Sequence, residues 1–284
     1  MERLWKITRK DETQIEYSAL ALTPDCTMNH EEILCKYLQT NVDLEKLCID
    51  WSEADSHVSK LLEAHDDLKG IRILDQNPLE TLFAFICSAN NNIKRISKMV
   101  NRLCILYGSK LELQAGISEE DSKIVGGNEG IMYAFPTIQQ MAVHLPTMEN
   151  QLRQDGFGYR AAYIAKTVKM LADAKDDYLH SLRSQDLKKA KEALREFSGV
   201  GPKKHNVVPV DTHVYKTTLR DYQPTLSAKS LTPTVHDEIG SFYIEKFGEY
   251  AGWAQALLFN AQLSQKRPNS SKQNESLKKK KKKN

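Results

Sequence analysis

A short segment near residue 200 carries residue types that can do nucleophilic chemistry. Gly199 and Gly201 lie one residue apart and are followed by Pro202 and Lys203. Glycines at this spacing allow a tight turn whose backbone N–H groups can converge on one anion, such as a phosphate. Asp211 follows an extended apolar segment and is placed to cap a new helix. A lysine beside such a turn and an aspartate at a helix N-terminus form a candidate nucleophile and its electrostatic partner.

Each of these features, taken alone, has an ordinary structural explanation. A Gly-Val-Gly string is most often a turn between two helices. Lys203 alone would be a solvated surface lysine, and Asp211 alone an ordinary helix cap. The functional interpretation is favoured because the three features follow one another closely.

The elements that must position this segment are mostly helical. Apolar residues recur at helical spacing over the ranges 79–86, 93–107, 161–171, 187–197, 234–247 and 250–263. Strand patterns over residues 4–8 and 15–20 flank a polar turn and predict a hairpin. Residues 115–133, which include four glycines, are expected to form a loop. The fold class is therefore expected to be mainly α (α+β), with a small N-terminal sheet.

Three other short stretches carry groups suited to recognition, and each has an alternative explanation. The asparagines at positions 90–92 lie between two helical patterns, where their amides can project from a loop or simply cap a turn. Tyr159 and Arg160 begin a helix, either as a tip that faces nucleic acid or as a packed tyrosine beside an exposed cation. Gln255 and Phe259 share one helix face and can line one pocket, although a phenylalanine alone is more often core.

The composition indicates a soluble globular protein of a reducing compartment. Hydrophobic residues make up 40% of the 284 residues and charged residues 27%. The five cysteines are odd in number, widely spaced and without a Cys-x-x-Cys pair, so zinc and disulfide scaffolds are not expected. The net charge of +3 includes the six lysines at positions 278–283, so the remaining chain carries −3. Secreted and membrane proteins are excluded by the lack of a long apolar run.

Together these stretches resemble the helix-hairpin-helix DNA glycosylases, and among them the eukaryotic-type 8-oxoguanine DNA glycosylases. The likeness extends from about residue 3 to residue 265, and the motifs that carry it lie in the family's order at positions 85–93, 156–161, 199–203, 208–213 and 250–259. It implies helical helix-hairpin-helix domains over residues 29–265. Residues 1–28 would be the remnant of a β-sheet subdomain, and residues 266–284 a disordered lysine-rich tail.

The resemblance implies a bifunctional DNA glycosylase and AP lyase that removes 8-oxoguanine opposite cytosine in base excision repair. Lys203 would attack the sugar C1′ as a free amine, expel the base and form a Schiff base that permits β-elimination. Asp211 would stabilise the cationic sugar, and His213 would lie near a phosphate. Gln255 and Phe259 would hold the extruded base by hydrogen bonding and stacking.

The resemblance also implies how the DNA is held open. The glycine turn would bind the DNA backbone. Asn90 would fill the gap left by the extruded base, and Tyr159 would wedge beside it. Arg95 and Arg160 would hydrogen-bond the orphaned cytosine.

No cofactor and no metal are expected. Related endonuclease-III-like and adenine-specific glycosylases carry four cysteines after the catalytic segment for an iron–sulfur cluster, whereas no cysteine follows Cys104 here. The expected partner is double-stranded DNA containing 8-oxoguanine, with no membrane, and the chain is expected to be a monomer in the nucleus or in a mitochondrial form. The lysine-rich tail would be a nuclear localisation signal, a segment that binds DNA without sequence specificity, or a solvated charged terminus.

Two departures from the family pattern lower the expected activity. Only Lys204 and His205 separate Lys203 from an extended segment, so the second helix of the family's hairpin has no room. The chain also begins inside the family's N-terminal sheet domain. We therefore expect a poorly active or unstable chain, shortened by splicing or by an error in the gene model. Lys204 stays an alternative nucleophile, and a non-catalytic DNA-binding protein or a glycosylase for another oxidised base are the alternative functions.

Overall fold

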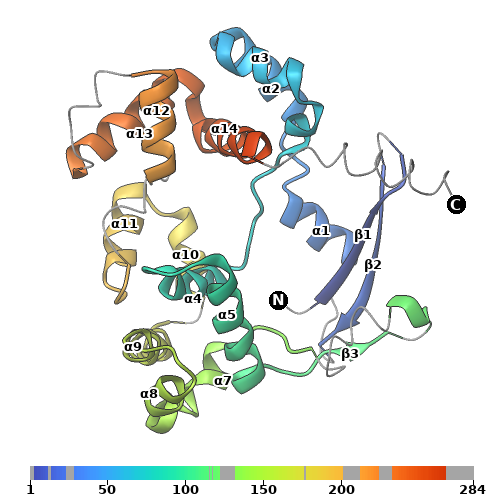
Figure 1. Cartoon of the computed structure of the whole chain (residues 1–284). Helices are drawn as coiled ribbons and strands as arrows, with labels where there is room; N and C mark the ends of the chain where they lie inside the picture. The colour runs from blue at the N-terminus through green and yellow to red at the C-terminus, as the bar shows by residue number, and fades with distance from the viewer. Residues whose placement is uncertain are drawn as a thin grey trace, which may run out of the picture. The chain divides into compact units, whose positions relative to one another are not determined.

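The computed structural model describes residues 3–11, 14–23, 29–114, 116, 118–121, 132–175, 177–200, 212–223 and 232–266. Its contacts divide the chain into two units, each built from two separate stretches of sequence (Figure 1). Unit 1 comprises residues 1–37 and 75–201, and unit 2 comprises residues 38–74 and 202–284. The expected helical region 29–265 therefore contributes to both units. The mainly α fold class with a small sheet is confirmed.

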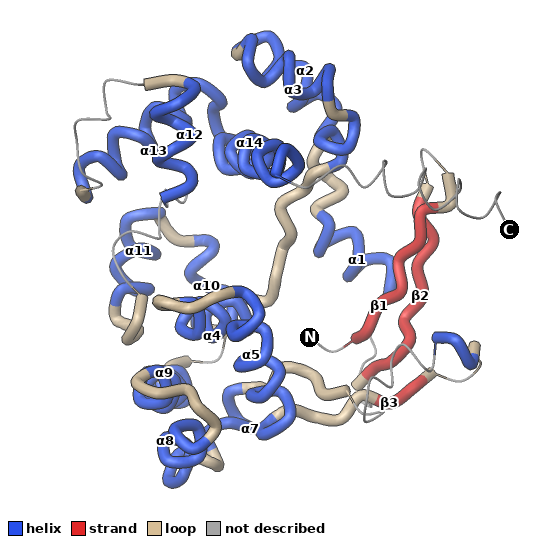
Figure 2. Tube along the Cα trace, viewed as in Figure 1, coloured by secondary structure: helices blue, strands red, loops and turns tan. Residues whose placement is uncertain are grey.

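A three-stranded antiparallel sheet lies in unit 1, with the order β1-β2-β3 (Figure 2). Strands β1 (Arg3–Arg9) and β2 (Ile15–Leu22) form the predicted hairpin, with one irregularity in the register after Leu4. The short strand β3 (Glu112–Leu113) pairs with the end of β2 and was not indicated by the sequence pattern. The buried face of this sheet centres on Ala21, which has no exposed surface.

The larger core of unit 1 is helical. Its helices are α1 His30–Leu38, α4 Pro78–Ser88, α5 Ile93–Tyr107, α7 Ile138–Ala142, α8 Leu145–Gln154, α9 Arg160–Asp173, α10 Tyr178–Ser181, η2 Leu182–Ser184 and α11 Leu187–Arg195. Helices α4, α5, α9 and α11 confirm predicted ranges, whereas α1, α7 and α8 fall where no periodicity was assigned. Phe83, Leu103, Leu152 and Ile164 have no exposed surface and bring α4, α5, α8 and α9 around one apolar cluster.

Two of the helices that border this core, α4 and α5, start where asparagine side chains cap them. Asn77 accepts hydrogen bonds from the backbone N–H groups of Leu79 and Glu80, and Pro78 occupies the first turn of α4. Asn92 accepts from the backbone of Arg95 and so begins α5. Because a cap satisfies backbone donors that the helix leaves unpaired, these residues fix where each helix begins.

The secondary structure of unit 2 consists of helices alone among the residues described. Its elements are α2 Leu44–Ala54, α3 Ser56–Ala64, η1 Asp66–Gly70, α12 Thr212–Asp221, α13 Pro233–Phe247, η5 Gly248–Tyr250 and α14 Ala251–Lys266. The core includes Trp51 and Tyr243, which are 2% and 0% exposed. Asp55 caps α3 and also lies 3.0 Å from the ammonium of Lys246 on α13, so that one buried carboxylate joins the two segments of this unit.

Truncating the core of unit 1 is expected to destabilise it. Ile164→Ala removes a side chain with no exposed surface and should lower the free energy of unfolding by about 2–5 kcal/mol, because the atoms lost leave a cavity. Ile93→Ala is the matched control, since Ile93 is 81% exposed and its loss should change the stability by less than about 0.5 kcal/mol. Urea denaturation followed by circular dichroism measures both. Equal effects of the two substitutions would contradict the described packing.

The cysteines of the described residues differ sharply in exposure. Cys35 is exposed, whereas Cys48, Cys87 and Cys104 are buried free thiols. Burial raises the pKa of Cys87 to about 12 and that of Cys104 to about 11, and it also raises the pKa of Cys48. The ordinary thiol pKa is 9.0. Above about pH 9 the unfolded chain therefore loses thiol protons that the folded chain retains. As a result, the free energy of unfolding falls as the pH rises.

Thiol titration tests this difference in exposure. In a Cys26→Ser background, which removes the one cysteine outside the described residues, native protein at pH 8 should release one equivalent of thionitrobenzoate from Ellman's reagent. Urea-unfolded protein should release four. The free energy of unfolding should also fall as the pH rises from about 9 toward 11, and Cys87→Ala should flatten that slope. Rapid reaction of all four thiols in native protein would show that these side chains are accessible.

Candidate functional site

Two turns of unit 1 carry most of the predicted recognition residues. The asparagine turn, residues 89–92, joins α4 to α5, and the tyrosine turn, residues 155–159, joins α8 to α9. Helix α9 packs against both α4 and α8, so the two turns lie at neighbouring helix ends (Figure 1). Segments some 70 residues apart in the chain thus form one surface.

The three asparagines of the asparagine turn have different environments. The Asn91 side chain donates to the carbonyl of Cys87 at 2.9 Å and contacts the Met99 sulfur at 3.3 Å. Asn92 caps α5 through a 3.0 Å hydrogen bond from the backbone N–H of Arg95. Asn90 is exposed and has a φ of 47°, a left-handed conformation that asparagine tolerates better than most residues. Asn91 and Asn92 therefore hold the turn, and Asn90 is presented at its surface.

The tyrosine turn has a buried anchor and an exposed tip. The side chain of Phe157 has no exposed surface, and its backbone N–H donates to the carbonyl of Leu152 at 3.0 Å. Gly156 before it has a φ of 81°, which explains why glycine occupies this position. Tyr159 is 46% exposed. The buried phenylalanine thus fixes the turn while the tyrosine two residues later faces outward.

Arg160 joins the two turns. Its side chain is buried, with the residue only 3% exposed, and Nη2 donates to the carbonyls of Ala89 and, at 3.2 Å, Asn90. The hydroxyl of Tyr159 donates to the same Ala89 carbonyl at 3.1 Å. The Arg160 guanidinium carbon also lies 4.6 Å from the centroid of the Tyr159 ring, a cation–π contact. Tyr159, Arg160 and Asn90 are therefore brought together in one place.

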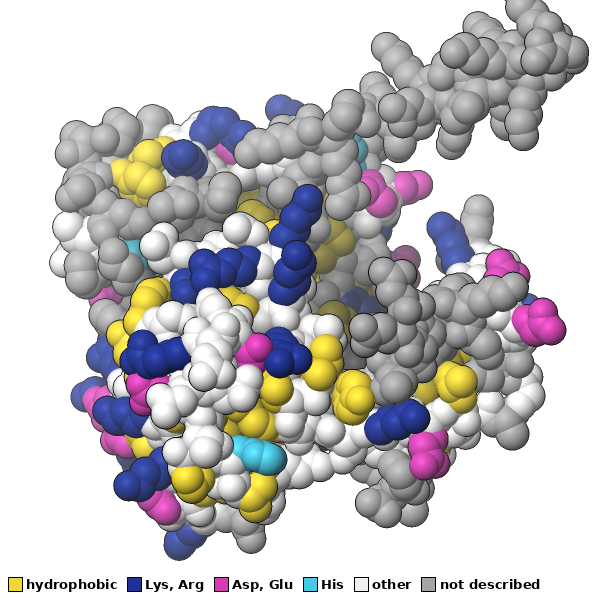
Figure 3. All heavy atoms as spheres, turned by 60° about the horizontal axis from the view of Figure 1, so that its bottom comes forward, with side chains coloured by type: hydrophobic (Ala, Val, Ile, Leu, Met, Phe, Trp, Pro, Cys, Tyr) yellow, Lys and Arg dark blue, Asp and Glu magenta, His cyan; other side chains and the backbone are white. Residues whose placement is uncertain are grey.

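Arg95 contributes to the same surface from α5. Its Nη2 donates to the carbonyl of Gly156 in the tyrosine turn at 2.9 Å. Helix α5 carries Lys94, Arg95, Lys98 and Arg102 and no acidic residue, so its exposed side is positive. Figure 3 views the molecule from the side on which α7, α8 and α9 lie in Figure 1, and basic side chains are interspersed there with acidic and apolar ones. Such a surface can contact phosphate groups at separate points.

The start of the predicted catalytic segment follows α11. Gly199 has a φ of 89°, and a Cβ built on it would lie 3.0 Å from the ring of Tyr163. Both the backbone conformation and the lack of space therefore require glycine here. Val200, which follows, is packed into the core of unit 1 with 8% of its surface exposed. The glycine turn thus starts from a fixed point on that core.

The predicted catalytic residues lie outside the described residues. These are Lys203, the alternative nucleophile Lys204, and Asp211, and the predicted DNA-binding residue Gly201 also lies outside the described residues. The helix predicted to follow Asp211 is present as α12, which begins at Thr212. His213 is in its first turn, and its side chain is not among those described. The shortened hairpin between Lys203 and Asp211 also stays a prediction from the sequence.

Gln255 and Phe259 lie on α14 in unit 2, as the helical spacing predicts. Gln255 is buried, with 8% of its surface exposed, and Phe259 is half-buried. Farther along the same side of the helix, Gln262 donates to the hydroxyl of Thr217 on α12. The role of the pair in holding a base stays a prediction, because their position on one helix face does not by itself define a ligand.

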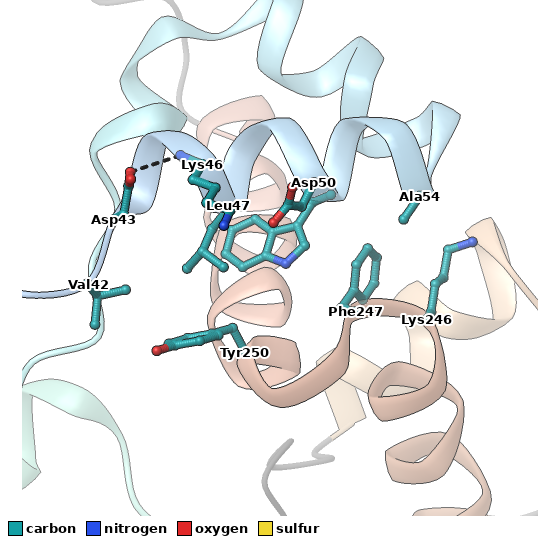
Figure 4. Close-up of a pocket in the computed structure, with 10 residues that line it drawn as sticks. Val42, Asp43, Lys46, Leu47, Asp50, Ala54, Lys246, Phe247 and Tyr250 are labelled. Atoms are coloured by element: carbon teal, nitrogen blue, oxygen red, sulfur yellow. Dashed lines mark hydrogen bonds between the residues drawn. The ribbon is translucent and has the colours of Figure 1, made fainter.

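Unit 2 also contains a depression of about 460 Å³ that the sequence analysis did not anticipate (Figure 4). The predicted site residues do not line it. Its walls come from the length of α2, the end of α13 and η5. Trp51, Phe247 and Tyr250 supply aromatic surfaces, and Lys46 and Asp50 are among the charged residues. Both signs of charge occur at its edge, so it presents no preference for an anion or a cation.

Two general features of the described part of the chain are relevant to ligands. Within the described ranges, no three His, Cys, Asp or Glu side chains gather where they could hold a metal ion. No helix there is long and apolar enough to cross a membrane.

The two helical units, one of them with a small sheet and two joined turns, give the fold, and comparison with known proteins identifies the family. Residues 83–232 match the HhH-GPD superfamily base excision DNA repair proteins, and residues 1–82 match the 8-oxoguanine DNA glycosylase N-terminal domain. The chain belongs to the HhH-GPD superfamily of base excision DNA repair proteins. The resemblance found in the sequence is confirmed.

Three relatives illustrate the extent of the similarity. The chain is 38% identical to N-glycosylase/DNA lyase OGG1 of Arabidopsis thaliana over 82% of its length, which is 62% of that protein. It is 32% identical to N-glycosylase/DNA lyase of Saccharomyces cerevisiae over 81% of its length and 66% of that protein. The chain thus spans less than two thirds of each of these curated relatives. A Clostridium acetobutylicum 8-oxoguanine glycosylase/lyase, solved with double-stranded DNA containing cytosine opposite 8-oxoguanine, matches with a TM-score of 0.64 and 26% identity over 92% of this chain and 88% of that one.

The junction at Arg160 is expected to stabilise unit 1 measurably. Arg160→Met keeps the length of the side chain but removes two hydrogen bonds from a charged donor, and should lower the free energy of unfolding by about 1–3 kcal/mol. Arg153→Met is the matched control, because Arg153 forms an exposed pair with Glu149 on α8 and should change the stability by less than about 1 kcal/mol. Urea denaturation compares the two variants. A smaller effect at Arg160 than at Arg153 would show that the junction does not stabilise the turns.

Proposed function

We propose that this chain is a DNA glycosylase and AP lyase that acts on 8-oxoguanine opposite cytosine in double-stranded DNA. The observation that carries the proposal is the junction of the asparagine and tyrosine turns by Arg160, which presents Asn90 and Tyr159 on one surface. The family match and the named activities of the Arabidopsis and yeast relatives support it. A side chain that fills a duplex must be held rigidly, and the junction supplies that rigidity.

In this proposal the two turns open the duplex. Asn90 fills the space that the extruded base leaves, and Tyr159 wedges beside it. Arg95 and Arg160 recognise the cytosine that remains. Because Arg160 already donates to two carbonyls through Nη2, its other N–H groups are the ones that would serve the base. Arg95 is exposed on α5, where a small movement of its side chain can reach DNA.

The proposed chemistry begins with the free amine of Lys203. The nitrogen attacks C1′ of the damaged nucleotide, the glycosidic bond breaks, and the base departs with the electron pair. Loss of the amine proton and opening of the sugar give a Schiff base, from which removal of a C2′ proton expels the 3′ phosphate. Asp211 stabilises the positive charge that develops on the sugar. Gln255 and Phe259 hold the extruded base, and His213 lies toward a phosphate.

The short spacing between Lys203 and Asp211 favours a second candidate. Without room for a full hairpin helix, the chain would keep the surface formed by the two turns and lose much of the chemistry. It would then be a DNA-binding protein of low or no activity. We also propose a monomer acting in the nucleus, with the lysines at positions 278–283 as an address or as a tether to DNA.

Borohydride trapping separates the two candidates. A labelled duplex with one 8-oxoguanine opposite cytosine, incubated with the chain and sodium borohydride, should give a covalent adduct that forms slowly. Lys203→Gln should abolish the adduct, and the matched variant Lys204→Gln should retain it, because only one of the two amines can reach C1′. The reverse pattern would make Lys204 the nucleophile.

If no adduct forms, binding of the chain to the same duplex, measured in parallel, distinguishes the two candidates. Salt-dependent binding to the same duplex without any adduct would support the non-catalytic candidate. An adduct that forms faster with another oxidised base would reassign the substrate, so a panel of lesions and opposite bases completes the test. Rapid multiple turnover by the purified chain would contradict the expectation of low activity.

A further inference from the structure

Helix α5 contacts the tyrosine turn at two points. At the first, Arg95 donates to the carbonyl of Gly156 at 2.9 Å. At the second, Nη2 of Arg102 lies 2.9 Å from a carboxylate oxygen of Asp155, the residue with which the turn begins. Arg95 and Arg102 are seven positions apart, about two helical turns, and so lie on the same face of α5. One face of α5 therefore contacts the start of the tyrosine turn at two points.

The carboxylate of Asp155 is bound on both of its oxygens. The second oxygen accepts from the side-chain amide of Gln151 at 3.0 Å, and the Asp155 side chain is 17% exposed. The hydrogen bond from Gln151, together with the hydrogen bond and positive charge of Arg102, holds the pKa of Asp155 below its ordinary value of 3.8, although partial burial opposes this. The carboxylate is therefore ionised at neutral pH, and its contribution is lost only as the pH falls below that value.

The tyrosine turn needs such an attachment because its backbone is adaptable. Gly156 and Gly158 have φ values of 81° and 60° and flank the one buried side chain of the turn, Phe157. Glycine restricts the chain less than any other residue, so a hold at the start of the turn limits how far Tyr159 can move.

The two contacts between α5 and the tyrosine turn are expected to respond differently to DNA binding. Under the proposed function, Arg95 turns toward the orphaned cytosine, which weakens or breaks its hydrogen bond to Gly156. The pair of Arg102 and Asp155 involves no group that the proposed function places on a base. It is therefore the contact that can persist while the duplex is bound.

We propose that Asp155 and Arg102 are positioning residues that fix the tyrosine turn on α5, so that Tyr159 and Arg160 keep their places when Arg95 engages DNA. This rests on the proposed function. The pair is partly exposed, with the Arg102 side chain 39% exposed, so it contributes little to the stability of the fold. Displacing a recognition group by about one ångström, in contrast, can lower activity strongly. The pair should therefore act on the placement of the turn.

The test compares Asp155→Ala with Glu149→Ala. Each substitution removes a carboxylate that pairs with an arginine. Asp155, at the end of α8, pairs with Arg102 of α5, whereas Glu149, within α8, pairs with Arg153 of the same helix and does not touch the turn. In DNA-free protein, hydrogen exchange at the amides of residues 156–160 should rise on the order of tenfold in Asp155→Ala and stay unchanged in Glu149→Ala. The urea midpoint should be nearly the same in both. Unchanged exchange in Asp155→Ala would overturn the proposal.

A second measurement reports on the bound state without requiring excision. Pyrrolocytosine placed opposite 8-oxoguanine brightens when the base loses its stacking partners, and wild-type protein should produce that increase. Asp155→Ala and Arg102→Asp should each reduce it, and the charge-exchanged pair Arg102→Asp with Asp155→Arg should restore most of it. Full brightening in every variant would refute the positioning role. No brightening with wild-type protein would refute the proposed function instead, and hydrogen exchange would still test the attachment of the turn.

Discussion

A guanidinium group that is almost completely buried loses its hydration, and this cost is tolerated only where hydrogen-bond acceptors in the protein offset it. Arg160 imposes this constraint on unit 1, because it is 3% exposed and donates to the carbonyls of Ala89 and Asn90. Ala89 is the C-cap of α4, where the helix dipole favours a positive charge. Arg160 itself begins α9, and at that N-terminus the helix dipole disfavours a positive charge. The contact with the C-terminus of α4 offsets this unfavourable interaction. The ends of α4 and α9 are therefore held together by one side chain.

The rest of the recognition surface depends on this junction. With the asparagine turn held from the side of α9, Asn91 and Asn92 can complete the turn internally, and Asn90 is left exposed in a left-handed conformation. Tyr159 lies against the same guanidinium and donates to the same carbonyl as Arg160. The two side chains expected to enter the duplex are thus supported by one buried charge. A wedge on two adaptable loops would otherwise lose much of its effect to conformational freedom.

Local chemistry made part of this architecture predictable. Helical spacing located α4, α5, α9, α11, α13 and α14 close to their observed bounds, and the hairpin of β1 and β2 was clear from alternation. Helices α2, α3 and α8 were not assigned, although at nine to eleven residues they are as long as α4 and α11, which were. The division into units was not predictable, since residues 38–74 pack with the C-terminal part of the chain and periodicity is a local property.

The sequence by itself determined the family motifs, the tight turn at Gly199 and the position of the three asparagines between two helices, because residue type decides which backbone conformations and local hydrogen bonds are available. It also placed Asn90, Tyr159 and Arg160 among the recognition residues. Only the tertiary structure decided that Arg160 is buried, that its acceptors are backbone carbonyls about 70 residues away, and that Asp155 pairs with Arg102. Every residue has a backbone carbonyl, so no sequence pattern marks the ones that a distant guanidinium will use.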